Sequence, residues 1–225
     1  MTHILRASTI LILLLLLAGP RLAAQESHPP FWDEIQAFKK EDSLHPPQKN
    51  SILFVGSSSF NFWKTVQQDF PGYRIVNRGF GGSSLPDVIR YQADIIFPYK
   101  PKQLVIYCGE NDLAGSDTVT AETVTARFKQ LFTSVRQKLP GVPIIFVSIK
   151  PSPSRQHLMP KMLEANAKIK SFLEQNRKTV FIDVYHKMLN PDGSPKGELF
   201  IEDSLHMNAK GYSIWQKSIK PHLLK

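Results

Sequence analysis

The stretch SILFVGSSSF spans residues 51–60 and predicts a short buried strand that ends in a tight turn. Ile52–Val55 is a continuous apolar run between a polar residue and a glycine, which favours a strand over a helix. Gly56 permits the turn, and the serines at 57–59 follow where a helix would begin. Hydroxyl and backbone N–H groups would then gather at the carboxyl end of a strand, where open α/β sheets bind ligands. On these ten residues alone, serine as an ordinary helix cap is the simpler interpretation.

The first 24 residues have the pattern of a secretory signal peptide. Arg6 supplies a positive charge, residues 10–17 form an uninterrupted apolar run, and Leu22–Ala24 contains the small residues that signal peptidase requires. The run is too short to span a bilayer, so we expect no stable membrane insertion after cleavage before Gln25. The alternative, an uncleaved membrane anchor, is disfavoured because Gly19–Arg21 breaks the run. We therefore expect an exported protein, either periplasmic or secreted.

The composition of the chain after removal of residues 1–24 limits the kinds of molecule that it could bind. Removing residues 1–24 takes away two arginines and no acid, so the formal net charge falls from +9 to +7. The basic residues are scattered, without a block of like charges or a basic stripe with interleaved aromatics, so we expect no nucleic-acid partner. Cys108 is the single cysteine and cannot form an internal disulfide. About 200 residues remain, enough for one domain that is stabilised by its core.

Strands alternate with helices along the chain, which predicts a single-domain, doubly wound α/β fold. We expect a leader at 25–50 that contains a short amphipathic helix, followed by one domain over 51–225. The expected strands lie at 52–55, 74–77, 102–107, 142–149 and 180–184, and the expected helices at 61–68, 120–139, 161–177 and 209–223. This order predicts a largely parallel five-stranded sheet with helices on both faces, in three α/β/α layers.

Polar residues follow several of these strands, at the edge of the sheet where ligands bind. Ser58 follows the first strand, and Gly82 lies in a glycine-dense loop after the second. Asn111 follows the third strand in the sequence GEND, and Asp203 and His206 lie beyond the fifth in DSLH. Since loops after different parallel strands meet at one edge, we expect these five residues to lie close together.

These five residues supply the groups that acyl transfer needs. A serine hydroxyl is a poor nucleophile at neutral pH, and His206 could accept the proton of Ser58 while Asp203 orients the imidazole. Residues i and i+3 on one turn project to the same side, so Asp203 and His206 can pair without help from another strand. The N–H groups of Ser58 and Gly82 and the amide of Asn111 could hold the oxyanion of a tetrahedral intermediate.

Four sequence blocks resemble, in order and spacing, the motif blocks of the SGNH hydrolases, also called GDSL-type esterases and lipases. The blocks are GSSS at 56–59, the Gly82 loop, GEND at 109–112 and DSLH at 203–206. The resemblance covers Ser51 to about Trp215. It implies Ser58 as nucleophile, Asp203 and His206 as acid and base, an oxyanion hole of Ser58, Gly82 and Asn111, and the flavodoxin-like strand order 2-1-3-4-5. One departure is that Ser57 and Ser59 replace the usual aspartate and leucine of the first block.

The resemblance implies a carboxylic ester hydrolase, and we expect its substrate to be a short-chain ester. The chain shows no long apolar lid or insertion, which favours removal of a small acyl group, acetyl first, from a carbohydrate or another small molecule. The family also includes lysophospholipases and thioesterases, which stay as alternatives. The serine at position 57 keeps open a further alternative, a carbohydrate-binding protein on a catalytically weak esterase scaffold.

Several other residues could take the catalytic roles. Ser57 or Ser59 could replace Ser58 as the nucleophile, and Asp183, at the end of the fifth strand, could replace Asp203 as the acid. Cys108 ends an apolar strand with no base near it in sequence, so we expect a small buried hydrophobe rather than a nucleophile.

We expect no metal and no cofactor. A metal-dependent phosphoesterase could use Asp203 and His206 as ligands, but no further carboxylate or histidine pair completes such a site. Three basic residues, Arg78, Lys150 and Arg155, lie on or near loops at the same edge of the sheet. They could contact an anionic or sugar substrate, although solvated surface charge is the simpler expectation.

Overall fold

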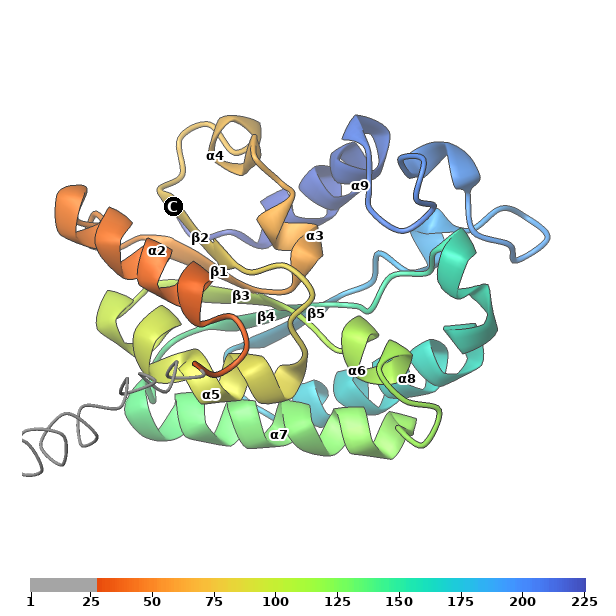
Figure 1. Cartoon of the computed structure of the whole chain (residues 1–225), viewed down its shortest axis with the longest axis horizontal. Coiled ribbons are helices and arrows are strands. Elements are labelled where there is room, and N and C mark those ends of the chain that lie inside the picture. Colours follow the sequence, from red (N-terminus) through yellow and green to blue (C-terminus); the bar gives the residue numbers. More distant parts are fainter. Residues whose placement is uncertain (1–27) are drawn as a thin grey trace, which may run out of the picture.

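The computed structural model describes residues 28–225, so the expected signal peptide lies outside the described residues (Figure 1). A five-stranded sheet forms the centre of this part of the chain, and every neighbouring pair of strands is parallel. The strands are β1 (Ile52–Gly56), β2 (Ile75–Gly79), β3 (Gln103–Tyr107), β4 (Ile144–Val147) and β5 (Thr179–Ile182). Their order is β2-β1-β3-β4-β5, which confirms the predicted fold class and strand order.

Helices cover both faces of the sheet, because the strands are apolar on both sides. The helices are α2 (Trp32–Leu44), α3 (Ser58–Asn61), α4 (Val66–Asp69), α5 (Leu85–Ile95), α6 (Glu110–Ala114), α7 (Ala121–Lys138), α8 (Met159–Glu174) and α9 (Ala209–Ile219). Figure 1 shows α5, α7 and α8 on one side of the sheet and α3, α4 and α9 on the other. Alternate residues of β1 face the two layers: Leu53 and Val55 belong to one core cluster, and Ile52 and Phe54 to the other.

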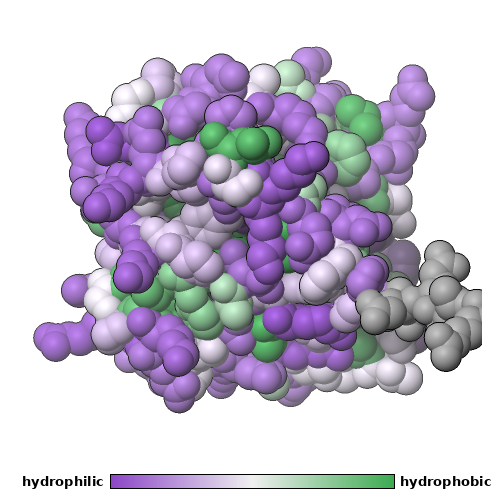
Figure 2. All heavy atoms as spheres, turned by 60° about the vertical axis from the view of Figure 1, so that its left-hand side comes forward, coloured by the Kyte–Doolittle hydropathy of each residue, from purple (hydrophilic) through white to green (hydrophobic). Residues whose placement is uncertain are grey.

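Helix α2 lies within the leader and packs on the domain. Ile35 is fully buried, and Phe31 and Phe38 pack against the same core cluster. The Tyr91 hydroxyl of α5 donates a 2.7 Å hydrogen bond to the Pro30 carbonyl, which fixes the start of the helix. The face seen in Figure 2 is mostly hydrophilic, with apolar side chains in small separate patches. Among residues 28–225, no helix is long and apolar enough to cross a membrane.

The helix predicted at 61–68 is wrong. The chain forms two single-turn helices there, α3 and α4, and Trp63 between them is buried in the core against Phe54 and Trp215. The Trp63 indole N–H donates to the Asp69 carboxylate at 2.5 Å. A continuous helix is interrupted here because the burial of a large aromatic side chain dominates over local helical preference.

Helix α5 was not predicted, although the sequence carries its start signal. Ser84 and Asp87 form a capping box, and a proline occupies the first turn, both of which are typical of a helix N-terminus. The helix buries Leu85, Val88 and Ile95 on one face. The sequence predicts a glycine-dense loop over residues 77–86, and the helical period only becomes clear beyond Ser84.

We predict that Gly56→Ala unfolds or severely destabilises the protein. Gly56 has a φ of +142°, and a Cβ atom there would lie 1.7 Å from the Tyr107 carbonyl oxygen. Backbone strain and overpacking cost about 1–3 kcal/mol each, so the free energy of unfolding should fall by more than about 3 kcal/mol. Urea denaturation followed by tryptophan fluorescence measures this loss.

Gly197→Ala is the matched control, because a Cβ at that position meets nothing within 4 Å. Its free energy of unfolding should change by less than about 0.5 kcal/mol. A Gly56→Ala protein as stable as this control would contradict the close approach of the two strands.

Candidate active site

Ser58 is placed by the turn at the end of β1. The Ser57 N–H donates to the Tyr107 carbonyl at 3.1 Å, and the Phe80 N–H donates to the Gly56 carbonyl at 3.0 Å. These bonds hold the turn between the ends of β2 and β3. Ser58 is the first residue of α3, so its backbone N–H has no acceptor within the helix.

The structure brings Ser58, His206 and Asp203 into one hydrogen-bonded chain. The Ser58 Oγ lies 3.0 Å from His206 Nε2, and His206 Nδ1 lies 2.5 Å from Asp203 Oδ2. The other carboxylate oxygen of Asp203 accepts the backbone N–H groups of Leu205 and His206, each at 2.9 Å. Ser204 adopts a left-handed φ of 56°, which closes the turn. The predicted pairing at i and i+3 is therefore present and fixed by the backbone.

The Asp203 carboxylate is held in its ionised form. Burial acts to raise its pKa, but the hydrogen bonds from the side chain and backbone of His206 and from the Leu205 N–H outweigh burial. Together they lower the pKa of Asp203 from 3.8 to about 2. An ionised carboxylate at Nδ1 fixes the proton of His206 on that nitrogen and leaves Nε2 as an acceptor toward Ser58.

Gly82 and Asn111 lie at the same edge of the sheet, joined through Ser83. The Ser83 Oγ donates to the Gly56 carbonyl at 3.2 Å, and the Ser83 carbonyl accepts the side-chain amide of Asn111 at 2.9 Å. Gly82 adopts a left-handed φ of +76°, which favours glycine. The structure thus joins Ser58, His206 and Asp203 directly, and it links Asn111 through Ser83 to the end of β1.

Residues 51–214 match the GDSL-like Lipase/Acylhydrolase family. The chain belongs to this family. The match covers the five residues described above, and it extends from the start of β1 into α9. The chain matches no curated protein.

Solved structures with this fold share little sequence with the chain. A Streptococcus pneumonia protein has a TM-score of 0.75 at 20% identity, covering 97% of this chain and 99% of its own. A GDSL-like lipase from Bacteroides thetaiotaomicron has a TM-score of 0.71 at 20% identity, covering 84% and 96%. A catalytic mutant of an acetylxylan esterase from Geobacillus stearothermophilus has a TM-score of 0.60 at 17% identity, covering 76% and 92%. At these identities the likeness is one of fold.

In this GDSL acylhydrolase the alternative nucleophiles are buried, and the alternative acid pairs with a different histidine. Ser57 and Ser59 are each only 2% exposed, whereas Ser58 is partly exposed and contacts His206. Asp183 pairs with His186 at 2.6 Å on the surface at the end of β5. Cys108 is buried, and burial raises the pKa of its thiol well above the ordinary value, which disfavours a thiolate.

The expectation of solvated surface charge is wrong for Lys150, Arg155 and Arg78. Lys150 is 1% exposed and pairs with the buried Glu110 at 3.0 Å, and Arg155 contacts the same carboxylate at 3.2 Å. Arg78 is also mostly buried, and it pairs with Asp42 of α2 and donates to the Tyr99 hydroxyl at 2.6 Å. Glu110 had no predicted role. A charged residue soon after an apolar strand, as Lys150 follows the run Ile144–Val147, is the signal that could have indicated this cluster.

An exposed aromatic ring lies against the catalytic histidine candidate. Phe62, just after α3, has its ring centroid 4.5 Å from that of His206, with the planes tilted by 49°. Its side chain is 49% exposed. A large apolar side chain that stays exposed beside a reacting group is available to contact a substrate.

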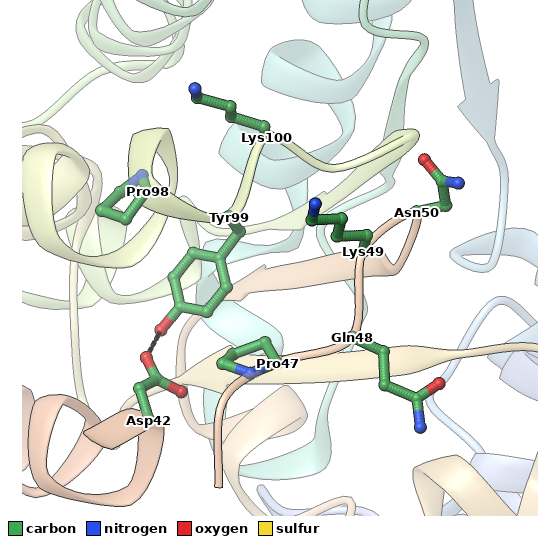
Figure 3. Close-up of a pocket in the computed structure, with 8 residues that line it drawn as sticks. All are labelled: Asp42, Pro47, Gln48, Lys49, Asn50, Pro98, Tyr99 and Lys100. Atoms are coloured by element: carbon green, nitrogen blue, oxygen red, sulfur yellow. Dashed lines mark hydrogen bonds between the residues drawn. The ribbon is translucent and has the colours of Figure 1, made fainter.

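The cavity in Figure 3 is separate from this site. It has a volume of about 570 Å³ and is lined by Asp42, residues 47–50 and residues 98–100, where the Tyr99 hydroxyl points toward Asp42. These residues precede β1 and β3, so the cavity lies at the amino ends of the strands, opposite Ser58. Among residues 28–225, no group of three or more His, Cys, Asp or Glu side chains could hold a metal ion.

Proposed function

We propose that this GDSL acylhydrolase is a serine carboxylic ester hydrolase with Ser58 as nucleophile, His206 as general base and Asp203 as its orienting acid. The observation that carries the proposal is the chain of two hydrogen bonds, 3.0 Å from Ser58 to His206 and 2.5 Å from His206 to Asp203. The Ser58–His206 distance lies within the range of about 2.6–3.2 Å in which a base can take a proton, and the bond to Asp203 orients the imidazole and stabilises its charged form.

The proposed reaction has two halves. His206 Nε2 takes the Ser58 proton as Oγ attacks the ester carbonyl, and the resulting oxyanion is held by the N–H groups of Ser58 and Gly82 and by Asn111. His206 then gives the proton to the leaving alcohol, and the acyl group stays on Ser58. Water, deprotonated by the same imidazole, releases the acid and restores the hydroxyl. Each oxyanion donor contributes about 10²–10³ in rate.

We infer that the substrate is an ester of a short acyl group with a carbohydrate or another small alcohol. Acetyl is the acyl group that we favour. The ring of Phe31 lies next to Gly82: a Cβ atom built on this glycine would be 3.9 Å from Phe31 Cε1. An aromatic ring therefore lies beside one of the proposed oxyanion donors. Two of the distant structural neighbours are an acetylxylan esterase and an acetyl esterase, which supports the same inference. In a series of p-nitrophenyl esters, kcat/KM should be highest for acetate; a maximum at octanoate or longer would favour a lysophospholipase or thioesterase instead.

We also propose that the protein is exported after cleavage before Gln25. The charge, apolar run and small residues of the first 24 positions support this. N-terminal sequencing of the protein from the culture medium or periplasm should begin at residue 25, and a full-length cytoplasmic product would contradict export.

We predict that Ser58→Ala abolishes both hydrolysis of p-nitrophenyl acetate and covalent labelling by a fluorophosphonate probe. Removal of the nucleophile should lower kcat by about 10⁴ or more, since triad members act as a unit. Ser57→Ala is the matched control, because it removes the neighbouring buried hydroxyl and should keep both turnover and labelling. Labelling that persists in Ser58→Ala would contradict the assignment, and an unlabelled wild-type protein would support the carbohydrate-binding alternative.

We predict that a single ionisation controls the acid limb of the pH profile. Because the pKa of Asp203 is lowered to about 2, its carboxylate stays charged as the pH falls from 7 to 3 and adds no ionisation of its own to this limb. A plot of log(kcat/KM) against pH should therefore have a slope of 1 on this limb. Tryptophan fluorescence at each pH checks that the protein stays folded. A slope near 2 above pH 3 would show that Asp203 also gains a proton in this range.

We predict that Phe62 contacts the alcohol part of the substrate. His206 protonates the leaving oxygen, so a ring that contacts that imidazole lies on the leaving-group side. Phe62→Ala should lower kcat/KM about tenfold for p-nitrophenyl acetate, since an aromatic contact contributes about 0.5–1.5 kcal/mol, and about twofold or less for methyl acetate.

Leu163→Ala provides the control, because Leu163 is a similarly exposed apolar residue beside the surface Asp183–His186 pair. It should leave both esters unaffected. An equal loss for the two esters in Phe62→Ala would mean that the ring supports His206 rather than the alcohol.

A further inference from the structure

A buried charge cluster lies directly behind the candidate oxyanion hole. Glu110, the first residue of α6, is 4% exposed and accepts the Tyr107 hydroxyl at 2.5 Å. Its carboxylate also contacts Lys150 Nζ at 3.0 Å and Arg155 Nη1 at 3.2 Å. Burying three charged groups costs more free energy than filling the same space with apolar side chains, so the cluster calls for an explanation other than stability.

Arg155 connects this cluster to the Asn111 side chain. The same Nη1 that contacts Glu110 donates a 2.9 Å hydrogen bond to Asn111 Oδ1. On its other side, Asn111 Nδ2 donates to the Ser83 carbonyl at 2.9 Å. An amide nitrogen has two hydrogens, so one remains after the bond to Ser83 and can point to a substrate oxyanion.

The bond from Arg155 determines which way the Asn111 amide faces. A cation at Oδ1 excludes the flipped amide, in which an NH₂ group would face the guanidinium. A charged donor on the carbonyl oxygen also withdraws electron density from the amide nitrogen, which strengthens the remaining N–H as a donor. Both effects favour stabilisation of negative charge at the position Asn111 faces.

Lys150 anchors the cluster to the triad turn. Its Nζ donates to the Leu205 carbonyl at 2.9 Å, and Leu205 lies between Asp203 and His206. Burial acts to raise the pKa of Glu110, but the charges of Lys150 and Arg155 outweigh burial and hold it below the ordinary value. Glu110 is therefore a carboxylate that fixes both cations.

We propose that Arg155, held in place by Glu110, is a positioning residue that orients and polarises the Asn111 amide for oxyanion binding. The inference rests on the proposed function, and it assigns a role to a residue that does not itself touch the reacting atoms. Its contribution passes entirely through Asn111, so it disappears when that amide is absent. A double-mutant cycle tests this dependence directly.

The experiment measures kcat and KM for p-nitrophenyl acetate in the wild-type protein, Arg155→Met, Asn111→Ala and the double variant. We expect Asn111→Ala to lower kcat about 10²–10³-fold and Arg155→Met to lower it about tenfold, as for a lost charge-assisted hydrogen bond, with KM within about twofold. The double variant should match Asn111→Ala within about threefold.

Two further variants separate positioning from stability. Asp112 is another buried carboxylate on α6, which contacts Arg127 at 2.8 Å and accepts the Leu85 N–H. Arg127→Met removes its cationic partner and is the control for loss of a buried ion pair. It should lower the melting temperature and leave kcat unchanged. If Arg155→Met does not fold, Arg155→Lys, which keeps a positive charge beside Glu110 but lacks the planar guanidinium, enters the same cycle.

The outcomes are distinct. A further tenfold loss of kcat in the double variant, or a rise in KM with kcat unchanged in Arg155→Met, would overturn the inference and leave the esterase proposal standing. A wild-type protein without Ser58-dependent turnover would overturn the proposed function and this inference with it.

Discussion

The parallel register of β1 with its two neighbours is the constraint on which the candidate site depends. Gly56 lies opposite Gly79 of β2 and Tyr107 of β3, so the three strands end at the same level of the sheet. The space at Gly56 is so small that the backbone of β3 fills the position of a side chain. The loops that leave this level carry Ser58, Gly82 and Asn111, and they cannot separate without breaking the register.

Features that depend on neighbouring residues could be predicted from the sequence. The continuous apolar run at 52–55 predicts a central strand, and the three-residue spacing of Asp203 and His206 predicts a pair that closes on its own turn. The strand order and the meeting of the five polar residues followed from the resemblance and from the rule that parallel strands present their loops at one edge. The structure shows this strand order and the contact of Ser58, His206 and Asp203, because each depends on local pattern and chain topology.

Features that depend on distant partners could not be predicted in the same way. Whether Lys150 is solvated or buried is decided by Glu110, 40 residues earlier, and by a carbonyl 55 residues later. The break between α3 and α4 likewise depends on the space that Phe54 and Trp215 leave for Trp63. In both cases the residue type alone favoured the commoner environment, exposed for lysine and helical for the segment around Trp63, and tertiary packing reversed that preference.

The contacts of Glu110 with Lys150 and Arg155 also set the distribution of charge around the site. Behind Asn111, one carboxylate faces two cations, so the Glu110 cluster carries one excess positive charge beneath the place where an ester oxygen would become negative. At the other end of the site, the ionised Asp203 faces the imidazole that would become positive in the same step. Developing charges of both signs would thus meet fixed charges of the opposite sign that are already in place before the reaction. Such an arrangement lowers the activation barrier because the protein does not have to reorganise as charge develops. An apolar replacement of the cluster could be equally stable, but it would remove one half of this balance.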